Sequence, residues 1–203
     1  MSDRAPASTA IRATYRLQFH KGFTFRDATA LVPYLARLGI SHIYASPLME
    51  ARPGSTHGYD IVNHNRLNPE IGTEAEFAAL AAALKAQGMG LILDIVPNHM
   101  AACFENRWWR DVLENGPSSR YARYFDIDWS SDDPRLTGKL LAPFLSVPLQ
   151  EALRSGSIKL VIDDETRSPT ITHYEHRFPV SPEDARALLA EPFTESRAAQ
   201  SNR

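Results

Sequence analysis

The sequence lacks the features that would place a protein outside the cell or in a membrane. Its single cysteine, Cys103, excludes an internal disulfide and fits a reducing compartment. No apolar run approaches the roughly 18 residues that a membrane span needs. The first ten residues, MSDRAPASTA, have no apolar segment of the kind found in secretion signals. These absences predict a soluble cytoplasmic protein.

An excess of charge of either sign is also missing. The 203 residues include 22 Lys and Arg against 24 Asp and Glu, which gives a formal net charge of -2. This balance argues against a nucleic-acid partner and against binding to a membrane surface. The expected partner is a neutral molecule. A hydrophobic content of 43% is enough for a packed core.

The first hundred residues alternate between strand and helix patterns, after a flexible leader at residues 1–10. Strands are predicted at Thr14–Phe19, Ser41–Leu48 and Leu91–Val96. The last of these is a continuous apolar run, which is typical of a strand covered on both faces of a parallel sheet. The alternation therefore predicts an α/β fold built on a parallel sheet.

Two helices are predicted between these strands, and each begins with a capping box. Thr24 opens the first helix and Thr73 opens the second, while Gly39 and Gly88 are placed to end them. Pro33 falls inside the first helix, where a proline costs about 3 kcal/mol. We therefore expect a kink in this helix or a later start.

The alternation stops after Met100. A short helix is predicted at Asn106–Glu114, ended by Gly116, and a hairpin is predicted where apolar residues alternate along Ile158–Ile162. The sequence therefore predicts that residues 101–203 form an inserted α+β subdomain and not a fourth strand–helix unit.

The strongest candidate site lies in the sequence Asp94-Ile-Val-Pro-Asn98-His99. An aspartate in an apolar strand is costly unless it is paired or hydrogen-bonded. The carboxyl ends of strands carry the active site in parallel barrels, so Asn98 and His99 are expected to contact a ligand. The structural alternative is a buried Asp that anchors a loop, with a solvated His beyond it.

A second polar cluster, His57-Gly58-Tyr59-Asp60, follows the preceding strand and is expected on the same rim. Gly58 permits a tight turn, Tyr59 offers a flat face to a sugar ring, and Asp60 offers acceptors to hydroxyl groups. Taken alone, this segment would be read as an ordinary turn capped by an Asp. Two polar clusters on one rim favour a binding site.

Together these motifs resemble the α-amylase superfamily, and more narrowly the maltooligosyltrehalose synthases, over roughly Ile11 to Leu189. The matching segments are TYRLQF, YLARLGISHIYASPL, RPGSTHGYDIV, NPEIGT, LILDIVPNHM, NRWWRDVLENGPSSRYARYFDIDW and YEHRFPV. The resemblance implies that residues 11–100 are the first three βα units of a (β/α)8 TIM barrel. It also implies that 101–203 form a lid-like subdomain, incomplete at its C-terminus.

The activity implied by the resemblance is a (1->4)-α-D-glucan 1-α-D-glucosylmutase reaction. The α-1,4 bond to the reducing-end glucose of a maltodextrin is broken and reformed as an α,α-1,1 bond, by intramolecular transglucosylation. No cofactor and no metal are implied. The pathway partner expected from the family is a maltooligosyltrehalose trehalohydrolase.

The resemblance also assigns roles to residues. The superfamily uses a nucleophilic carboxylate and an acid/base carboxylate, and both are expected beyond Arg203, so we expect this chain alone to be inactive. The expected substrate-binding residues are His57, Tyr59, Asp60, Asp94, Asn98 and His99. Among them, His99 is expected to bond the sugar 6-hydroxyl next to the scissile bond.

Other residues that could take part in binding or catalysis are better explained by structural roles. Trp109 shares a helix face with Val112 and is read as core, while Trp108 points elsewhere and is a weak candidate for sugar stacking. His173 and His176 are three apart on an expected strand, so they would face opposite sides and hold no metal. Cys103 has no His partner that would make it a nucleophile.

Two alternatives remain open at this stage. The chain could belong to another α-amylase-type glycoside hydrolase, which would share DIVPNH but not the long second-half likeness. It could also be a non-catalytic glucan-binding piece, since the expected catalytic carboxylates are not in it.

Overall fold

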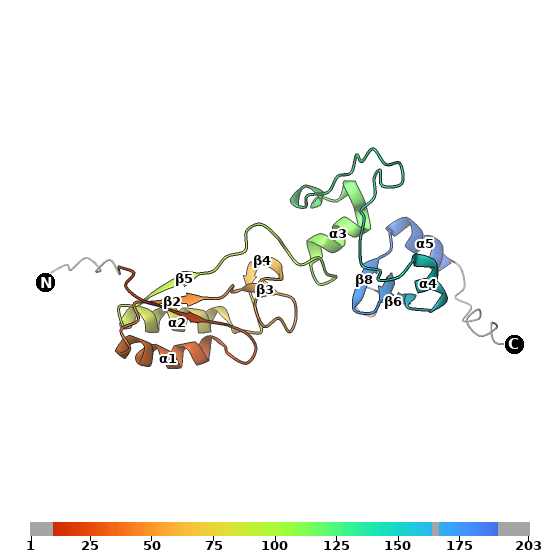
Figure 1. The fold of residues 1–203 in the computed structure, drawn as a ribbon. Helices are drawn as coiled ribbons and strands as arrows, with labels where there is room; N and C mark the ends of the chain where they lie inside the picture. Colours follow the sequence, from red (N-terminus) through yellow and green to blue (C-terminus); the bar gives the residue numbers. More distant parts are fainter. Residues whose placement is uncertain (1–9, 164–166, 191–203) are drawn as a thin grey trace. The chain divides into compact units, whose positions relative to one another are not determined.

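The computed structural model of the chain describes residues 10–163 and 167–190 (Figure 1). The chain divides into two compact units, residues 1–102 and 103–203, and each contains helices and strands. Most of the leader predicted at residues 1–10 lies outside the described residues. Within them, no helix is long and apolar enough to cross a membrane.

A parallel sheet of three strands forms the centre of the first unit, in the order β1-β2-β5. The strands are β1 (Thr14–Leu17), β2 (His42–Ala45) and β5 (Gly90–Leu93). Thr14 of β1 lies opposite His42 of β2, and His42 lies opposite Gly90 of β5. The parallel sheet predicted from the sequence is confirmed.

Two helices, α1 (Phe25–Arg37) and α2 (Glu74–Ala86), pack against each other beside this sheet (Figure 1). Both capping boxes are present. The apolar faces of the helices meet the inner sheet residues in one core, and its fully buried members include Phe25, Val32, Leu35, Ile43, Leu80 and Leu84.

Of the kink or late start expected for α1, the late start does not occur, because the helix begins directly after Thr24. The backbone N–H of Thr24 donates to Asp27 Oδ2 at 2.8 Å, which satisfies the capping box at that point. Pro33 lies on the exposed side of the helix, where water can bond the carbonyl that the proline ring leaves unpaired.

The strand predicted at Leu91–Val96 is found in part as β5, but its predicted length and its burial on both faces are wrong. β5 ends at Leu93, which is 45% exposed, and Ile95 beyond it is 71% exposed. Among the described residues β5 has a neighbour on one side only, β2, so it forms an edge of the sheet. Burial of this apolar run on both faces would require further elements packed against its exposed side chains.

A hairpin occurs where only a loop was expected. Strands β3 (Met49–Ala51) and β4 (Ile61–Leu67) pair antiparallel, with register shifts at Glu50. The central sequence of β4, Asn-His-Asn-Arg, is polar and has no alternation that would reveal a strand. The ion pair between Glu50 and Arg66 joins the two strands.

The second unit contains a short helical segment followed by an antiparallel sheet of order β6-β7-β8. Its elements are α3 (Arg107–Asn115), η1 (Gly116–Ser118), η2 (Ala122–Tyr124), α4 (Leu149–Arg154), β6 (Ile158–Ile162), β7 (Pro169–His173), β8 (His176–Pro179) and α5 (Pro182–Ala190). The predicted pairing of Ile158–Ile162 in a hairpin is confirmed by β6 and β7. The helix predicted before Gly116 is confirmed by α3.

Buried polar groups order the second unit. Asn106 caps α3 by accepting from the backbone N–H groups of Trp108 and Trp109 at 3.1 and 3.2 Å. Asp163, 2% exposed, forms an ion pair with Arg177. The Arg177 guanidinium also lies 4.5 Å from the ring centroid of Phe104.

Candidate functional site

The register of the parallel sheet gathers polar side chains on one face. Arg16 of β1 lies opposite Tyr44 of β2, and Tyr44 lies opposite Ile92 of β5. Side chains alternate along a strand, so Asp94, two residues after Ile92, points to the same face as Arg16 and Tyr44. The intervening residues Leu17 and Ala45 point to the opposite face and are buried in the helix-covered core.

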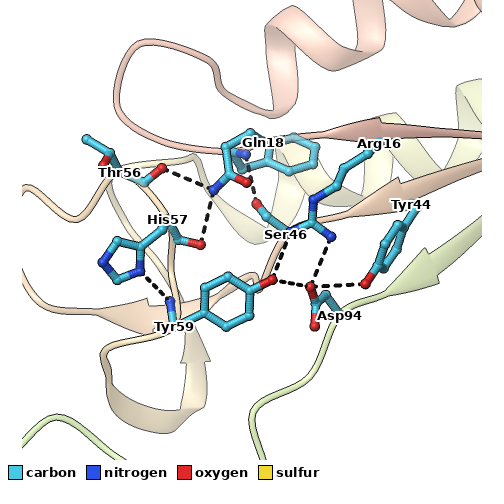
Figure 2. Close-up of polar contacts among 9 residues, drawn as sticks. Arg16, Gln18, Tyr44, Ser46, Thr56, His57, Tyr59 and Asp94 are labelled. Atoms are coloured by element: carbon cyan, nitrogen blue, oxygen red, sulfur yellow. Dashed lines mark hydrogen bonds and ion pairs between the residues drawn. The ribbon is translucent and has the colours of Figure 1, made fainter.

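One oxygen of Asp94 joins the cluster together (Figure 2). Oδ2 accepts from Tyr59 Oη at 2.5 Å, from Arg16 Nη1 at 3.0 Å and from Tyr44 Oη at 3.2 Å. The second guanidinium nitrogen of Arg16 donates to Tyr59 Oη at 2.9 Å, and the guanidinium lies 4.5 Å from the Tyr44 ring centroid. Arg16, Tyr59 and Asp94 thus form a closed ring of hydrogen bonds.

These contacts favour the ionised form of Asp94. The hydrogen bond from Tyr59, with those from Arg16 and Tyr44, lowers the pKa of Asp94 although partial burial opposes the shift. The same bond raises the pKa of Tyr59, because the neutral phenol is the form that donates to Asp94. The cluster therefore holds a carboxylate and a neutral phenol at neutral pH.

The loop before Tyr59 fixes the position of this ring. Gly58 has a φ of +78°, and a Cβ there would lie 2.8 Å from the carbonyl oxygen of Pro47, so only glycine fits without strain. The His57 ring stacks near the Tyr59 ring at 6.0 Å, and its Nδ1 accepts from the Tyr59 N–H at 3.1 Å. Gln18 Nε2 donates to the carbonyls of Thr56 and His57 at 3.0 and 3.1 Å (Figure 2).

His99 is joined to the same tyrosine through the backbone. Its Nε2 lies 3.1 Å from the Tyr59 carbonyl oxygen, and its Nδ1 lies 3.0 Å from Asn98 Oδ1. Both partners are oxygens, and a neutral imidazole has only one N–H. Only one of the two contacts is therefore a hydrogen bond unless the ring is protonated, and the exposed ring can exchange either contact for a ligand hydroxyl.

Asp60 is held within its own loop. Its Oδ1 accepts from Ser55 Oγ at 2.5 Å and lies 3.8 Å from His57 Nδ1. Four of the six residues predicted as substrate-binding, His57, Tyr59, Asp94 and His99, are linked by direct contacts to Tyr59 or Asp94. Asn98 adjoins them through His99, and Asp60 adjoins them through His57. Whether any of them binds a sugar stays a prediction.

Residues of the cluster that were not predicted are Arg16, Gln18, Tyr44 and Ser46. Ser46 is fully buried and accepts from the Phe19 N–H at 2.8 Å, which ties the end of β1 to the end of β2. The alternation of polar and apolar residues in the first strand could have identified Arg16 and Gln18, because these two polar residues share one face of the strand. Their partners depend on the register between strands, which the sequence does not state.

An apolar cavity of 270 Å³ adjoins the cluster. It is lined by Pro47, Leu48, Met49, Ile61, His64, Leu93, Asp94, Ile95, Val96 and Pro97. Small-molecule sites combine such apolar walls with a few polar groups that fix orientation. Hydrogen-bonding groups, a flat phenol ring and apolar walls suit a neutral polyhydroxyl compound.

The aromatic residues of α3 pack against their own unit. The Trp108 ring stacks on Tyr121 at 5.3 Å and meets Tyr124 at 5.1 Å. Trp109 meets Phe125 at 5.2 Å, and Val112 on its face is buried, which fits the predicted packing role.

The predicted geometry of His173 and His176 is wrong. They lie opposite each other across the turn between β7 and β8, because Tyr174 adopts a φ of 51° and the chain reverses there. Both rings contact Phe144, at 5.6 and 5.8 Å. Residues 10–163 and 167–190 contain no group of three or more His, Cys, Asp or Glu side chains that could hold a metal ion.

Burial raises the pKa of the half-buried Cys103 thiol to about 11, and a hydrogen bond with Glu105 adds to this shift. A thiol with this pKa is a poor nucleophile at neutral pH.

Several known proteins resemble this chain over part of its length. The family model for the α-amylase catalytic domain matches residues 25–151. A Mycobacterium tuberculosis protein provisionally named maltooligosyl trehalose synthase is 46% identical over 140 residues, which are 66% of this chain and 18% of that protein. An intracellular maltogenic amylase of Bacillus subtilis is 36% identical over 94 residues, which are 46% of this chain and 15% of that enzyme.

A solved structure extends the likeness. The maltooligosyltrehalose synthase of Arthrobacter ramosus is 42% identical, with a TM-score of 0.72, over 84% of this chain and 21% of that one. The chain therefore spans about a fifth of the length of these synthases. Since the family model covers more than half of its residues, Tyr59 and Asp94 included, the chain belongs to the α-amylase catalytic-domain family.

Proposed function

We propose that this chain is the N-terminal part of an α-glucan isomerase that converts the reducing-end α-1,4 linkage of maltodextrins into an α,α-1,1 linkage. One observation carries the proposal. The synthases resemble the chain along most of its length, including the second unit, whereas the maltogenic amylase aligns with less than half of it. A general α-amylase-type hydrolase is therefore the second candidate.

The cluster supports binding of one glucosyl unit. In this proposal the Tyr59 ring packs against the sugar, His99 bonds its 6-hydroxyl, and the Asp94 carboxylate keeps Tyr59 in place. His57, Asp60 and Asn98 complete the binding residues by orienting the loop and the imidazole. Uncharged hydroxyls suit this mixture of donors, acceptors and an aromatic face.

The chemical step belongs to residues outside this chain. Retaining glycosidases break the bond with one carboxylate as nucleophile and a second as acid/base, about 5–5.5 Å apart. By family resemblance these groups follow Arg203 in the whole protein. Positioning groups alone cannot replace a covalent step, so the chain by itself is inactive in this proposal.

Isomerisation also requires that water stay out while the freed glucose turns around. We assign this task to residues 101–203 as a lid-like subdomain that covers the barrel mouth. The barrel itself would begin with the three βα units of residues 11–100. The proposed setting is the cytoplasm, with maltodextrin as substrate and a maltooligosyltrehalose trehalohydrolase as the enzyme that uses the product.

Product analysis tests the proposal. The full-length protein should convert maltopentaose into a non-reducing product of unchanged mass that ends in trehalose, with little free glucose. Shorter reducing sugars as the main products would favour the hydrolase instead. The chain of residues 1–203 should leave maltopentaose unchanged, and a non-reducing product from it would refute the placement of the catalytic carboxylates.

A further inference from the structure

Arg16 is the one charged residue of the cluster to which neither the family match nor the sequence motifs give a role. We propose that Arg16 is a positioning residue that holds the Tyr59 ring and its hydroxyl proton in the orientation used for sugar binding. The functional part of this inference rests on the proposed glucan isomerase. The geometric part rests on the contacts of Arg16 alone.

The direction of each hydrogen bond follows from the groups involved. A guanidinium can only donate, and an ionised carboxylate can only accept. Tyr59 Oη lies 2.9 Å from Arg16 Nη2 and 2.5 Å from Asp94 Oδ2, so it accepts from Arg16 and its own proton points at Asp94. Arg16 therefore fixes the phenol proton as well as the phenol oxygen.

Arginine suits this task for a geometric reason. Its planar fork presents two parallel N–H groups, and here one reaches Asp94 at 3.0 Å while the other reaches Tyr59. Stacking of the guanidinium on the Tyr44 ring, 4.5 Å from the centroid, sets the plane of the fork. A lysine ammonium at this position is a point charge without that fork.

Placement on the sheet argues against a purely stabilising role. The Arg16 side chain is 36% exposed, and exposed ion pairs add little to stability. It lies on the sheet face opposite the apolar core, and Tyr59 beside it is 37% exposed. The contacts of Arg16 thus order partly exposed groups on the sheet face opposite the core and do not order the core itself.

The first experiment needs no substrate. In full-length protein labelled with ¹³C at tyrosine Cζ, the ionisation of Tyr59 is followed by NMR as the pH is raised, with Tyr59→Phe to assign the signal. Arg16→Met should raise the pKa of Tyr59 above its wild-type value, because Arg16 favours the tyrosinate form. The matched control is Arg26→Met, which removes an arginine of α1 that pairs with Glu76 of α2 and should leave the pKa of Tyr59 unchanged. An unshifted Tyr59 in Arg16→Met overturns the proposal.

The second experiment measures kcat and KM for isomerisation of maltopentaose. Arg16→Met should lower kcat/KM by about 100-fold, since a displacement of roughly 1 Å in a positioning group can cost this factor. Arg16→Lys keeps the charge near Asp94 but loses the planar fork, so its kcat/KM should lie between that of Arg16→Met and that of the wild type. In the double variant with Tyr59→Phe, the loss from Arg16→Met should be at most about threefold, because the group that Arg16 positions is gone.

Three further outcomes would decide against the proposal or against the function on which it rests. Equal kcat/KM values for Arg16→Met and Arg26→Met overturn the proposal. A double variant of Arg16→Met and Tyr59→Phe whose loss in kcat/KM equals the product of the two single losses also overturns it. If wild-type protein does not isomerise maltopentaose, the proposed function fails. The Tyr59 titration alone then decides whether Arg16 orients Tyr59.

Discussion

Replacing Asp94 by Asn removes one negative charge from the centre of the cluster while keeping the size of the side chain. The oxygen of the neutral amide still accepts hydrogen bonds, but it is a weaker acceptor than a carboxylate oxygen and cannot balance the Arg16 cation. In the wild type, Tyr59 Oη and Arg16 Nη1 donate to the same charged oxygen of Asp94, at 2.5 and 3.0 Å. We expect Tyr59 and Arg16 to lose their fixed orientation in Asp94→Asn.

The size of the effect follows from the burial of the pair. Hydrogen bonds to a charged group contribute about 1.5–3 kcal/mol, whereas exposed ion pairs contribute about 0–1 kcal/mol. The Asp94 side chain is 15% exposed and that of Arg16 is 36% exposed, which places the pair between these cases. Together the contacts of Asp94 should contribute about 2–4 kcal/mol to the placement of Tyr59 in the transition state, or roughly 30- to 900-fold in kcat/KM.

Asp27→Asn is the matched control. Asp27 Oδ2 accepts two hydrogen bonds, from the N–H and Oγ1 of Thr24 at 2.8 and 2.7 Å, and these bonds cap α1 without involving Arg16, Tyr44 or Tyr59. Both variants should lose some thermal stability, and only Asp94→Asn should lose activity. The assay is kcat/KM of the full-length variants on maltopentaose, with melting temperature alongside. Activity of Asp94→Asn within about threefold of Asp27→Asn would refute the reasoning.

Three further predictions concern the same protein. His99→Ala should lower kcat/KM about 5- to 150-fold, the loss of a hydrogen bond worth about 1–3 kcal/mol, while the exposed ring leaves the melting temperature nearly unchanged; unchanged kinetics would place His99 outside the site. Because hydrogen bonds from Tyr59 and Arg16 lower the pKa of Asp94, its stabilising effect exists above the unfolded-state pKa of about 3.9 and disappears as the pH falls through the lower folded-state value. The difference in unfolding free energy between wild type and Asp94→Asn should thus shrink below about pH 4, and a difference that stays constant down to pH 2 would contradict this. Maltodextrin should protect residues 101–190 of the full-length protein from limited proteolysis, and equal cleavage with and without ligand would remove the lid role.

The elements with local determinants could be predicted from the sequence. Capping boxes at Thr24 and Thr73 involve residues only three apart, and the helices begin where these boxes place them. The same holds for α3, whose cap and terminal glycine lie within eleven residues of each other. Local hydrogen bonds of this kind do not depend on the rest of the fold.

Features that depend on distant pairing could not be predicted in the same way. Arg16 and Asp94 are 78 residues apart, and their contact follows from the register of three strands. The β3–β4 hairpin has a polar central sequence, and the turn at Tyr174 uses a left-handed conformation that a non-glycine residue rarely adopts. The sequence therefore identified Tyr59, Asp94 and His99 as candidates. It did not identify Arg16, which donates to both Tyr59 and Asp94.

The open edge at β5 has a consequence for the production of this chain as a separate polypeptide. In the part of the chain that the structure describes, no strand pairs with this edge, and Leu93 and Ile95 beside it are exposed. The edge therefore offers both backbone hydrogen bonds and apolar surface to any other chain. Such a surface favours self-association that rises with protein concentration. Co-expression with the remainder of the proposed barrel as a second polypeptide should suppress it, because the strands of that polypeptide would occupy the edge on which the copies otherwise meet.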